Sequence, residues 1–102
     1  MKVDRKAEQE AIVYLTERIN ISNSGELKNV LQDLCDENYK TVAIDFTETK
    51  MIDSSCLGRL LMFQKKFREN NGELVITNVT SDYIKKMFKM IHLNKVISIV
   101  EK

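Results

Sequence analysis

Short runs of β-branched and aromatic residues alternate along this chain with longer segments in which apolar residues recur every three or four positions. Residues 11–16 form the first run of the strand type, and the polar residues 7–10 before them predict a turn from an opening strand arm near residues 2–6. Residues 41–46 are apolar on both faces except for Asp45, as in a central strand covered on two sides. Two further runs predict strands, at 73–77, which resembles 41–46, and at 96–100.

Helical periodicity fills the intervals between these runs. A first helix is predicted from about Ser22 to Glu37, and the small polar residues at its start are typical of helix caps. A second helix begins after Asp53 and ends near residues 70–72, Asn-Asn-Gly, because Asn and Gly readily adopt the left-handed conformation that stops a helix. A third opens at residues 81–82. The residues expected to face inward are Leu27, Val30, Leu31 and Leu34; Leu57, Leu60, Leu61, Gln64 and Phe67 or Arg68; and Ile84, Met87, Phe88 and Ile91.

The order of these elements predicts the fold class. Helices that alternate with strands after an opening hairpin connect parallel strands through right-handed crossovers. We therefore expect an α/β fold: a mixed, mainly parallel sheet of about five strands with helices packed against it. The 102 residues contain no proline, linker or internal repeat, so we expect a single domain over residues 1–102.

Composition narrows the classes of partner and cofactor. Sixteen basic against fifteen acidic residues give a formal net charge of +1, too little for a global field, so we expect neither nucleic acid nor a membrane as partner. Any charged partner must be recognised by local patches. Residues 1–5 show no secretion signal, which predicts a cytoplasmic protein. The two cysteines, Cys35 and Cys56, are too few for a disulfide framework or a zinc site, and we expect no metal or cofactor.

Residues 52–58, Ile-Asp-Ser-Ser-Cys-Leu-Gly, place small polar side chains where a strand gives way to the second helix. Asp53 can cap that helix, while Ser54 and Ser55 present hydroxyls over its first turn. Free backbone N–H groups at a helix N-terminus favour negative charge, so an exposed hydroxyl here suits a modifiable switch. A helical Gly58 costs about 1 kcal/mol relative to alanine, which hints at close approach of another molecule. A merely capped helix start is the competing interpretation.

Catalytic chemistry finds little support. The one histidine, His92, lies at the end of the third helix, where an interaction with the helix dipole explains it better than a role as base for Ser54. Asp45 and Asp53 flank a loop but are better explained as a strand end and a helix cap. Cys56 lies near a helix start that would stabilise a thiolate, yet a covered small residue is the simpler explanation. We therefore expect that the protein is not an enzyme. An enzyme that uses Ser54 or Cys56 is the least favoured of the alternative functions.

The run at 41–46, followed by a loop and Met-Ile-Asp-Ser-Ser-Cys-Leu-Gly at 51–58, resembles the phosphorylation-site region of bacterial anti-sigma factor antagonists of the STAS family. That domain is shared with the tails of sulfate transporters. Residues 15–20 occupy the place of the family's Leu-Thr-Gly-Glu-Leu-Asp segment, and residues 70–74 that of its Gly-Gly-Glu strand entry. The resemblance covers nearly the full chain in element order, and Asp-Ser-Ser-x-Leu-Gly is its most specific part.

This resemblance implies a switch between partners. In the family, a partner that is both anti-sigma factor and serine protein kinase phosphorylates the serine directly after the aspartate, which is Ser54 here. The unphosphorylated protein would bind that partner, phosphorylation would release it, and a phosphoserine phosphatase would restore binding. The expected partner-binding residues are Asn20, Asp53, Ser54, Ser55, Cys56 and Arg59. An alternative within the family is a scaffold subunit of a signalling or transporter complex in which Ser54 stays unmodified.

The chain departs from the family pattern at four places. Cys56 stands where the family commonly has glycine, Glu17 replaces the glycine of the strand-end turn, and Asn20 replaces an aspartate of the partner-facing loop. The family's C-terminal helix is expected to be missing or very short. Its absence would leave part of one sheet face uncovered and open to self-association, so we expect a monomer or a weak homodimer.

Overall fold

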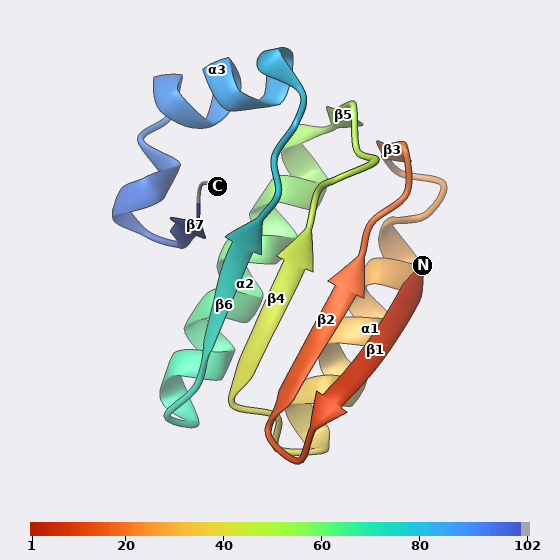
Figure 1. Cartoon of the computed structure of the whole chain (residues 1–102), viewed down its shortest axis with the longest axis vertical. Coiled ribbons are helices and arrows are strands. Elements are labelled where there is room, and N and C mark those ends of the chain that lie inside the picture. Colours follow the sequence, from red (N-terminus) through yellow and green to blue (C-terminus); the bar gives the residue numbers. More distant parts are fainter. Residues whose placement is uncertain (101–102) are drawn as a thin grey trace.

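A five-stranded sheet in the order β1-β2-β4-β6-β7 organises the molecule (Figure 1). The computed structural model describes residues 1–100. The first two strands form the antiparallel hairpin, and every other neighbouring pair in this sheet is parallel, which confirms the expected mixed, mainly parallel sheet. The strands of this sheet are β1 (Lys2–Ala7), β2 (Glu10–Tyr14), β4 (Thr41–Asp45), β6 (Glu73–Thr77) and β7 (Ser98–Val100).

Three helices connect the parallel strands. In Figure 1, α1 (Ser24–Asp36) and α2 (Ser54–Glu69) lie together behind the sheet, while α3 (Asp82–Met90) crosses the end toward which β4 and β6 point. A 3₁₀ turn, η1 (Leu93–Lys95), leads from α3 into β7. Each helix begins and ends within about two residues of its predicted bounds. Within residues 1–100, no helix combines the length and apolar character needed to cross a bilayer.

The core lies between the sheet and its helices. Alternate residues of the central strands point toward α1 and α2 and are buried, among them Val13, Ile44 and Ile76. The helices meet them with side chains that are likewise buried: Leu27, Leu31, Leu34, Leu57, Leu60, Phe63 and Phe67. This is the alternation of a sheet with one buried face.

The opposite face of the sheet has no helix over it, so the expectation that the central strand is covered on two sides is wrong. Ile12, Ala43 and Val75 stand side by side on that face and are only half-buried. The reason is topological. The order β2-β4-β6-β7 never reverses, so successive right-handed crossovers all pass on the same side of the sheet.

The helix ends and the residues expected to face inward show two further differences from the predictions and one confirmation. Asn71, with φ of 63°, stops α2 in the left-handed conformation as predicted. Ile91 was expected to face inward but is 49 % exposed, because α3 ends one residue before it. Val30, Leu61 and Met87 are half-buried and pack against the core from its edge. The expected shortening of a helix after the last strand concerns residues beyond 100, outside those described.

Candidate functional site

A small two-stranded sheet brings the loop before α1 and the start of α2 together. β3 (Arg18–Ile19) and β5 (Met51–Ile52) run parallel, so the residues that follow them emerge side by side. The backbone N–H of Asp53 donates to the carbonyl of Ile19 at 3.0 Å, which places Asp53 next to Asn20. The site is therefore assembled from two segments more than thirty positions apart in the chain.

Asp53 caps α2, as the sequence predicts. Its Oδ1 accepts from the backbone N–H of Cys56 at 2.9 Å and from the hydroxyl of Ser55 at 2.9 Å. Its backbone is extended, with φ of −86° and ψ of 167°, which is the usual conformation of a capping residue. The hydrogen bond from the Cys56 N–H, supported by the Ser55 hydroxyl, lowers the pKa of Asp53.

The two serines of the site are both exposed but differ in how they are bonded. The hydroxyl of Ser55 is engaged with the capping carboxylate of Asp53. Within residues 1–100, the hydroxyl of Ser54 makes no hydrogen bond. Ser54 is the first residue of α2, where backbone N–H groups lack partners within the helix. An accessible, uncommitted hydroxyl thus lies at the position most favourable to negative charge.

Cys56, which follows the two serines, does not reach the protein surface. Its side chain is fully buried, and burial raises the pKa of its thiol to about 11. The expectation that Cys56 contacts a partner is therefore wrong for its side chain, because the third residue of α2 already faces the core, as Leu57 does. The raised pKa also disfavours the thiolate that cysteine chemistry would require.

Asparagines hold the neighbouring loop. The Oδ1 of Asn20 accepts from the backbone N–H and the hydroxyl of Ser22, at 2.9 and 2.6 Å. The Oδ1 of Asn23 accepts from the N–H of Asn20 at 2.9 Å, while its amide nitrogen donates to the carbonyl of Arg18 at 2.7 Å. The side chain of Asn23 therefore fixes the loop and does not cap α1. An Asn in place of an acidic residue at 20 keeps these acceptor bonds without adding charge.

Two exposed apolar side chains lie on the two segments that form the site, and the sequence analysis did not identify them. Ile21 is 85 % exposed next to Asn20, and Met62 is 42 % exposed on α2. Met62 follows Ser55 and Gly58 at helical spacing, so the three share one side of the helix. A Cβ on Gly58 would meet nothing within 4 Å, so this side is open. The signal available in the sequence was that Met62 falls outside the inward-facing positions of the helix.

The basic residues of α2 separate into two groups. Arg59 is half-buried one turn from Ser55. Lys66 is engaged elsewhere, since its Nζ donates to Gln32 Oε1 at 3.1 Å and lies 5.1 Å from the centre of the Phe63 ring. Lys66 therefore lies at the contact between α1 and α2, while Lys65 and Arg68 are exposed on the second half of α2.

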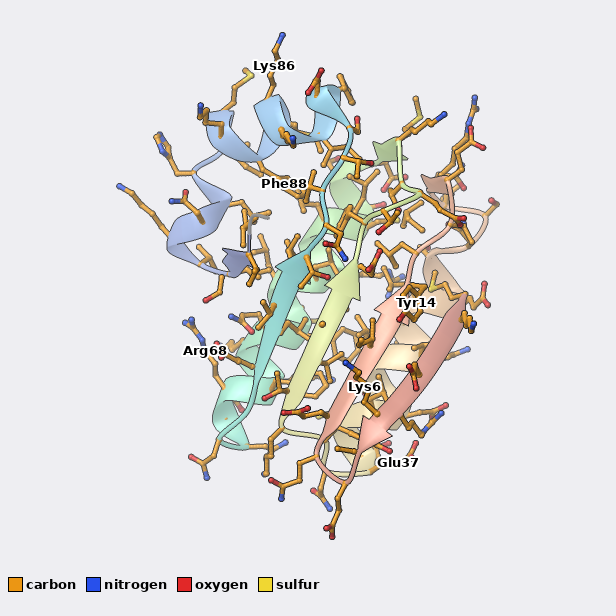
Figure 2. The ribbon with its side chains drawn as sticks, viewed as in Figure 1. Lys6, Tyr14, Glu37, Arg68, Lys86 and Phe88 are labelled. Carbon is orange, nitrogen blue, oxygen red and sulfur yellow. The ribbon has the colours of Figure 1, made fainter. Side chains whose placement is uncertain are left out.

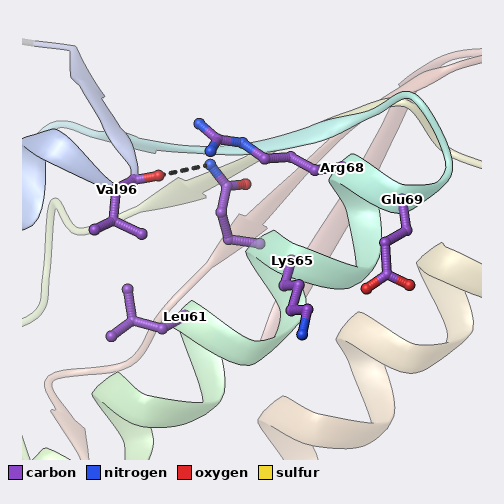
Figure 3. A pocket seen from close by; sticks show the side chains of 6 residues that line it. Leu61, Lys65, Arg68, Glu69 and Val96 are labelled. Atoms are coloured by element: carbon purple, nitrogen blue, oxygen red, sulfur yellow. Dashed lines mark hydrogen bonds between the residues drawn. The ribbon is translucent and has the colours of Figure 1, made fainter.

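A shallow hollow lies along the second half of α2, away from the serines (Figure 3). Gln64 forms its floor: its Oε1 accepts from the backbone N–H of Leu74 at 2.6 Å and its Nε2 donates to the carbonyl of Val96 at 3.1 Å. The pairing of β6 with β7 begins only at Val75, so the buried amide of Gln64 supplies the acceptor for the N–H of Leu74. The hollow is therefore a structural feature of the sheet edge. It is lined by Leu61, Gln64, Lys65, Arg68, Glu69 and Val96.

The residues weighed for catalysis do not form a catalytic arrangement among residues 1–100. His92 is exposed with φ of 54°, and its side chain makes no hydrogen bond there; its backbone N–H donates to the carbonyl of Lys89. Asp45 is buried and accepts from the backbone N–H of Thr47 and the side chain of Asn78, each at 2.8 Å. Neither is bonded to Ser54 within residues 1–100, so neither is placed to activate its hydroxyl.

Comparison with known proteins matches residues 3–101 to the family model described as Mlab, STAS domain. The anti-sigma factor antagonist SpoIIAA in its unphosphorylated form has the same fold, with a TM-score of 0.83, 14 % identity, and 99 % of this chain and 88 % of that one covered. SpoIIAA of Bacillus in the phosphorylated form has a TM-score of 0.76 and 14 % identity, and the match covers 99 % of this chain and 91 % of that one. An anti-sigma factor antagonist from Mycobacterium paratuberculosis has a TM-score of 0.78 and 12 % identity, and the match covers 99 % of this chain and 87 % of that one.

Proposed function

This chain belongs to the STAS domain family, and we propose that it is an anti-sigma factor antagonist controlled by phosphorylation of Ser54. The unmodified protein binds a partner that is both anti-sigma factor and serine protein kinase. Phosphorylation of Ser54 by that kinase releases the complex, and a phosphoserine phosphatase restores the binding form. Its likeness to SpoIIAA in both phosphorylation states supports a switch that operates without refolding.

The observation that carries this proposal is the difference between the two exposed serines. A kinase must bring the attacking hydroxyl into line with the γ-phosphate, which an uncommitted side chain permits. Ser54 meets that requirement, whereas Ser55 would first have to give up its hydrogen bond to Asp53. We therefore assign Ser54 as the modified residue.

Electrostatics explains how the modification would act. A phosphate adds about −1.5 to −2 charges at pH 7 and three acceptor oxygens. At the first residue of α2 the free backbone N–H groups and the helix dipole tolerate this charge, so the modified protein stays folded. Docking of a partner would have to remove water from the dianion, next to the carboxylate of Asp53, and that desolvation opposes the complex.

We define the docking surface by the exposed and half-buried residues on the two segments that meet at Ser54. Ile21 and Met62 supply apolar area, and Gly58, one turn before Met62 on α2, admits close approach of a partner backbone. Arg59 borders the surface and would interact with an acidic group of the partner. The docking surface comprises Asn20, Ile21, Asp53, Ser54, Ser55, Gly58, Arg59 and Met62. Such a protein acts in the cytoplasm, as a monomer or a weak homodimer.

A second candidate within the family is a scaffold subunit whose Ser54 is never modified. The description of the matching family model, Mlab, STAS domain, does not restrict its members to anti-sigma factor antagonists, which favours keeping this candidate. The same docking surface would then bind a permanent partner, and charge at Ser54 would have no regulatory role.

Phosphorylation and binding measured on matched variants separate the two. The purified protein is incubated with ATP and each candidate serine kinase from the same genome, and the phosphate is located by mass spectrometry. The switch predicts phosphate on the wild type and on Ser55→Ala, none on Ser54→Ala, and loss of partner binding by Ser54→Asp. Stable binding of the same partner by both Ser54→Ala and Ser54→Asp, without phosphate on the wild type, would instead establish the scaffold.

A further inference from the structure

Positive charge is concentrated in the segment that forms α3, η1 and β7. Residues 82–100, which form these elements, contain four lysines, one histidine and a single acidic residue, Asp82, which leaves twelve basic against fourteen acidic residues in the rest of the chain. All four lysines are exposed, and within residues 1–100 none of their ammonium groups makes an ion pair or hydrogen bond. They are Lys85, Lys86, Lys89 and Lys95. The formal net charge of +1 therefore conceals a cationic end of the molecule.

Exposed apolar side chains are interspersed with these lysines. Tyr83 is 63 % exposed, Met90 81 % and Ile91 49 %. The core-facing side of α3 is already occupied by Ile84 and Phe88, and the ring of Phe88 packs edge-to-face on Phe46 with 5.5 Å between ring centres. The three exposed side chains are thus available to another surface without loss of packing.

This end of the molecule is accessible from outside. Figure 1 shows α3 lying across the end of the sheet, with no element beyond it, and in Figure 2 Lys86 points away from the body of the molecule. Ser81 caps the helix by accepting from the N–H of Ile84. The lysines are therefore displayed from a capped helix at one end of the molecule, where another surface can reach them.

We propose that this cationic end, formed by the exposed residues of α3 and η1, binds anionic lipid headgroups at a membrane surface. Lysine and exposed apolar residues together are typical of helices that lie in the lipid interface, where lysine stems cover apolar surface and their ammonium groups reach the headgroups. Exposed Met90 and Ile91 favour this contact over nucleic acid, whose binding depends on phosphate contacts and base stacking.

The kind of basic residue favours a lipid surface over a protein. Protein interfaces are enriched in arginine and depleted in lysine, because the planar guanidinium fits bidentate pairing. All basic residues of 83–100 except His92 are lysines, although arginine occurs elsewhere in the chain. Whole-chain charge, which argued against a membrane partner, is not decisive here because salt limits the attraction to about 8 Å from each charge.

Vesicle sedimentation tests the proposal. The full chain is mixed with phosphatidylcholine vesicles that contain or lack a minor share of phosphatidylglycerol. The first variant is Lys85→Gln/Lys86→Gln/Lys89→Gln. The matched control, Lys6→Gln/Lys28→Gln/Lys65→Gln, removes the same charge from exposed lysines elsewhere. A third variant, Met90→Ser, removes apolar area alone, and circular dichroism verifies that each variant is folded.

Each lysine near an anionic surface adds about a five-fold gain in affinity, so the α3 triple variant should bind about 100-fold more weakly. The control should bind to within a few-fold of wild type, and Met90→Ser should fall between them. Binding that is absent, that ignores phosphatidylglycerol, or that the control loses equally would overturn the proposal. Tighter binding to polyglutamate than to the vesicles would assign the cationic end to an acidic protein instead. None of these outcomes depends on Ser54, so the proposed switch is tested separately.

Discussion

Replacement of Gly58 by alanine separates the stability of the free protein from the affinity of its docking surface. Gly58 is the fifth residue of α2, is exposed, and would place a Cβ in open space with no atom within 4 Å. Alanine in a helix interior is favoured over glycine by about 0.8–1 kcal/mol. With no compensating clash, the whole of that gain should appear in the free energy of unfolding. In a domain of this size it raises the melting temperature by about 4–8 °C.

The assay is urea denaturation followed by circular dichroism, with partner affinity measured on the same preparations. Gly58→Ala should unfold at higher urea with an unchanged slope, yet bind the partner more weakly, since the added methyl group stands where a partner approaches. Gly72→Ala is the contrasting variant: its Cβ would lie 2.5 Å from the carbonyl oxygen of Lys40. It should therefore destabilise the fold by about 1–3 kcal/mol. A Gly58→Ala variant less stable than wild type would refute the structural reasoning, and a more stable variant with unchanged affinity would exclude Gly58 from the docking surface.

Three further predictions concern the sheet edge, the helix cap and the thiols. Gln64→Leu should cost about 1–3 kcal/mol of unfolding free energy in urea, because the Leu74 N–H loses its acceptor; faster hydrogen exchange at Leu74 is expected, and protection equal to wild type would contradict this. Because its hydrogen bonds lower the pKa of Asp53, the unfolded chain binds the proton first as pH falls. The stability due to Asp53 is complete at neutral pH and is lost as pH falls through about 3.9 and below; Asp53→Asn should flatten this part of the curve, and an unchanged curve would disprove the role. Iodoacetamide should modify the half-buried Cys35 of the native protein well before Cys56, whose thiol is buried with a pKa of about 11, and equal rates measured by mass spectrometry would show that the helix start opens readily.

Local chemistry made much of the fold predictable. Short β-branched and apolar runs located the five strands of the main sheet, and apolar residues at helical spacing located the helices, although the short strands β3 and β5 were missed. The carboxylate of Asp53 and the hydroxyl of Ser81 marked two helix starts, and Asn71 marked a helix end. Each of these signals depends on residues within one turn or one strand. They therefore do not require knowledge of what lies across the sheet.

The errors arose where the outcome depends on the whole fold. Apolar Ala43 and Val75 suggested strands covered on both faces, whereas the unreversed strand order places the crossovers on one side. Cys56 was expected at the docking surface, but the pitch of α2 turns it into the core two residues after Ser54. Of the small polar residues expected to cap α1, Asn23 stands at the cap position, but its side chain bonds to Arg18 and not to the helix. The exposure of Ile21 likewise depends on how two loops meet at the paired strands β3 and β5.

The affinity of the anti-sigma factor kinase for the unmodified and the Ser54-phosphorylated protein tests the central claim most directly. Both forms should show the same circular dichroism spectrum, because the start of α2 tolerates the phosphate. We predict that phosphorylation weakens binding by about 100-fold or more. Docking would have to remove water from the phosphate, which is negatively charged and lies next to the negative carboxylate of Asp53. Equal affinity of the two folded forms would contradict the account.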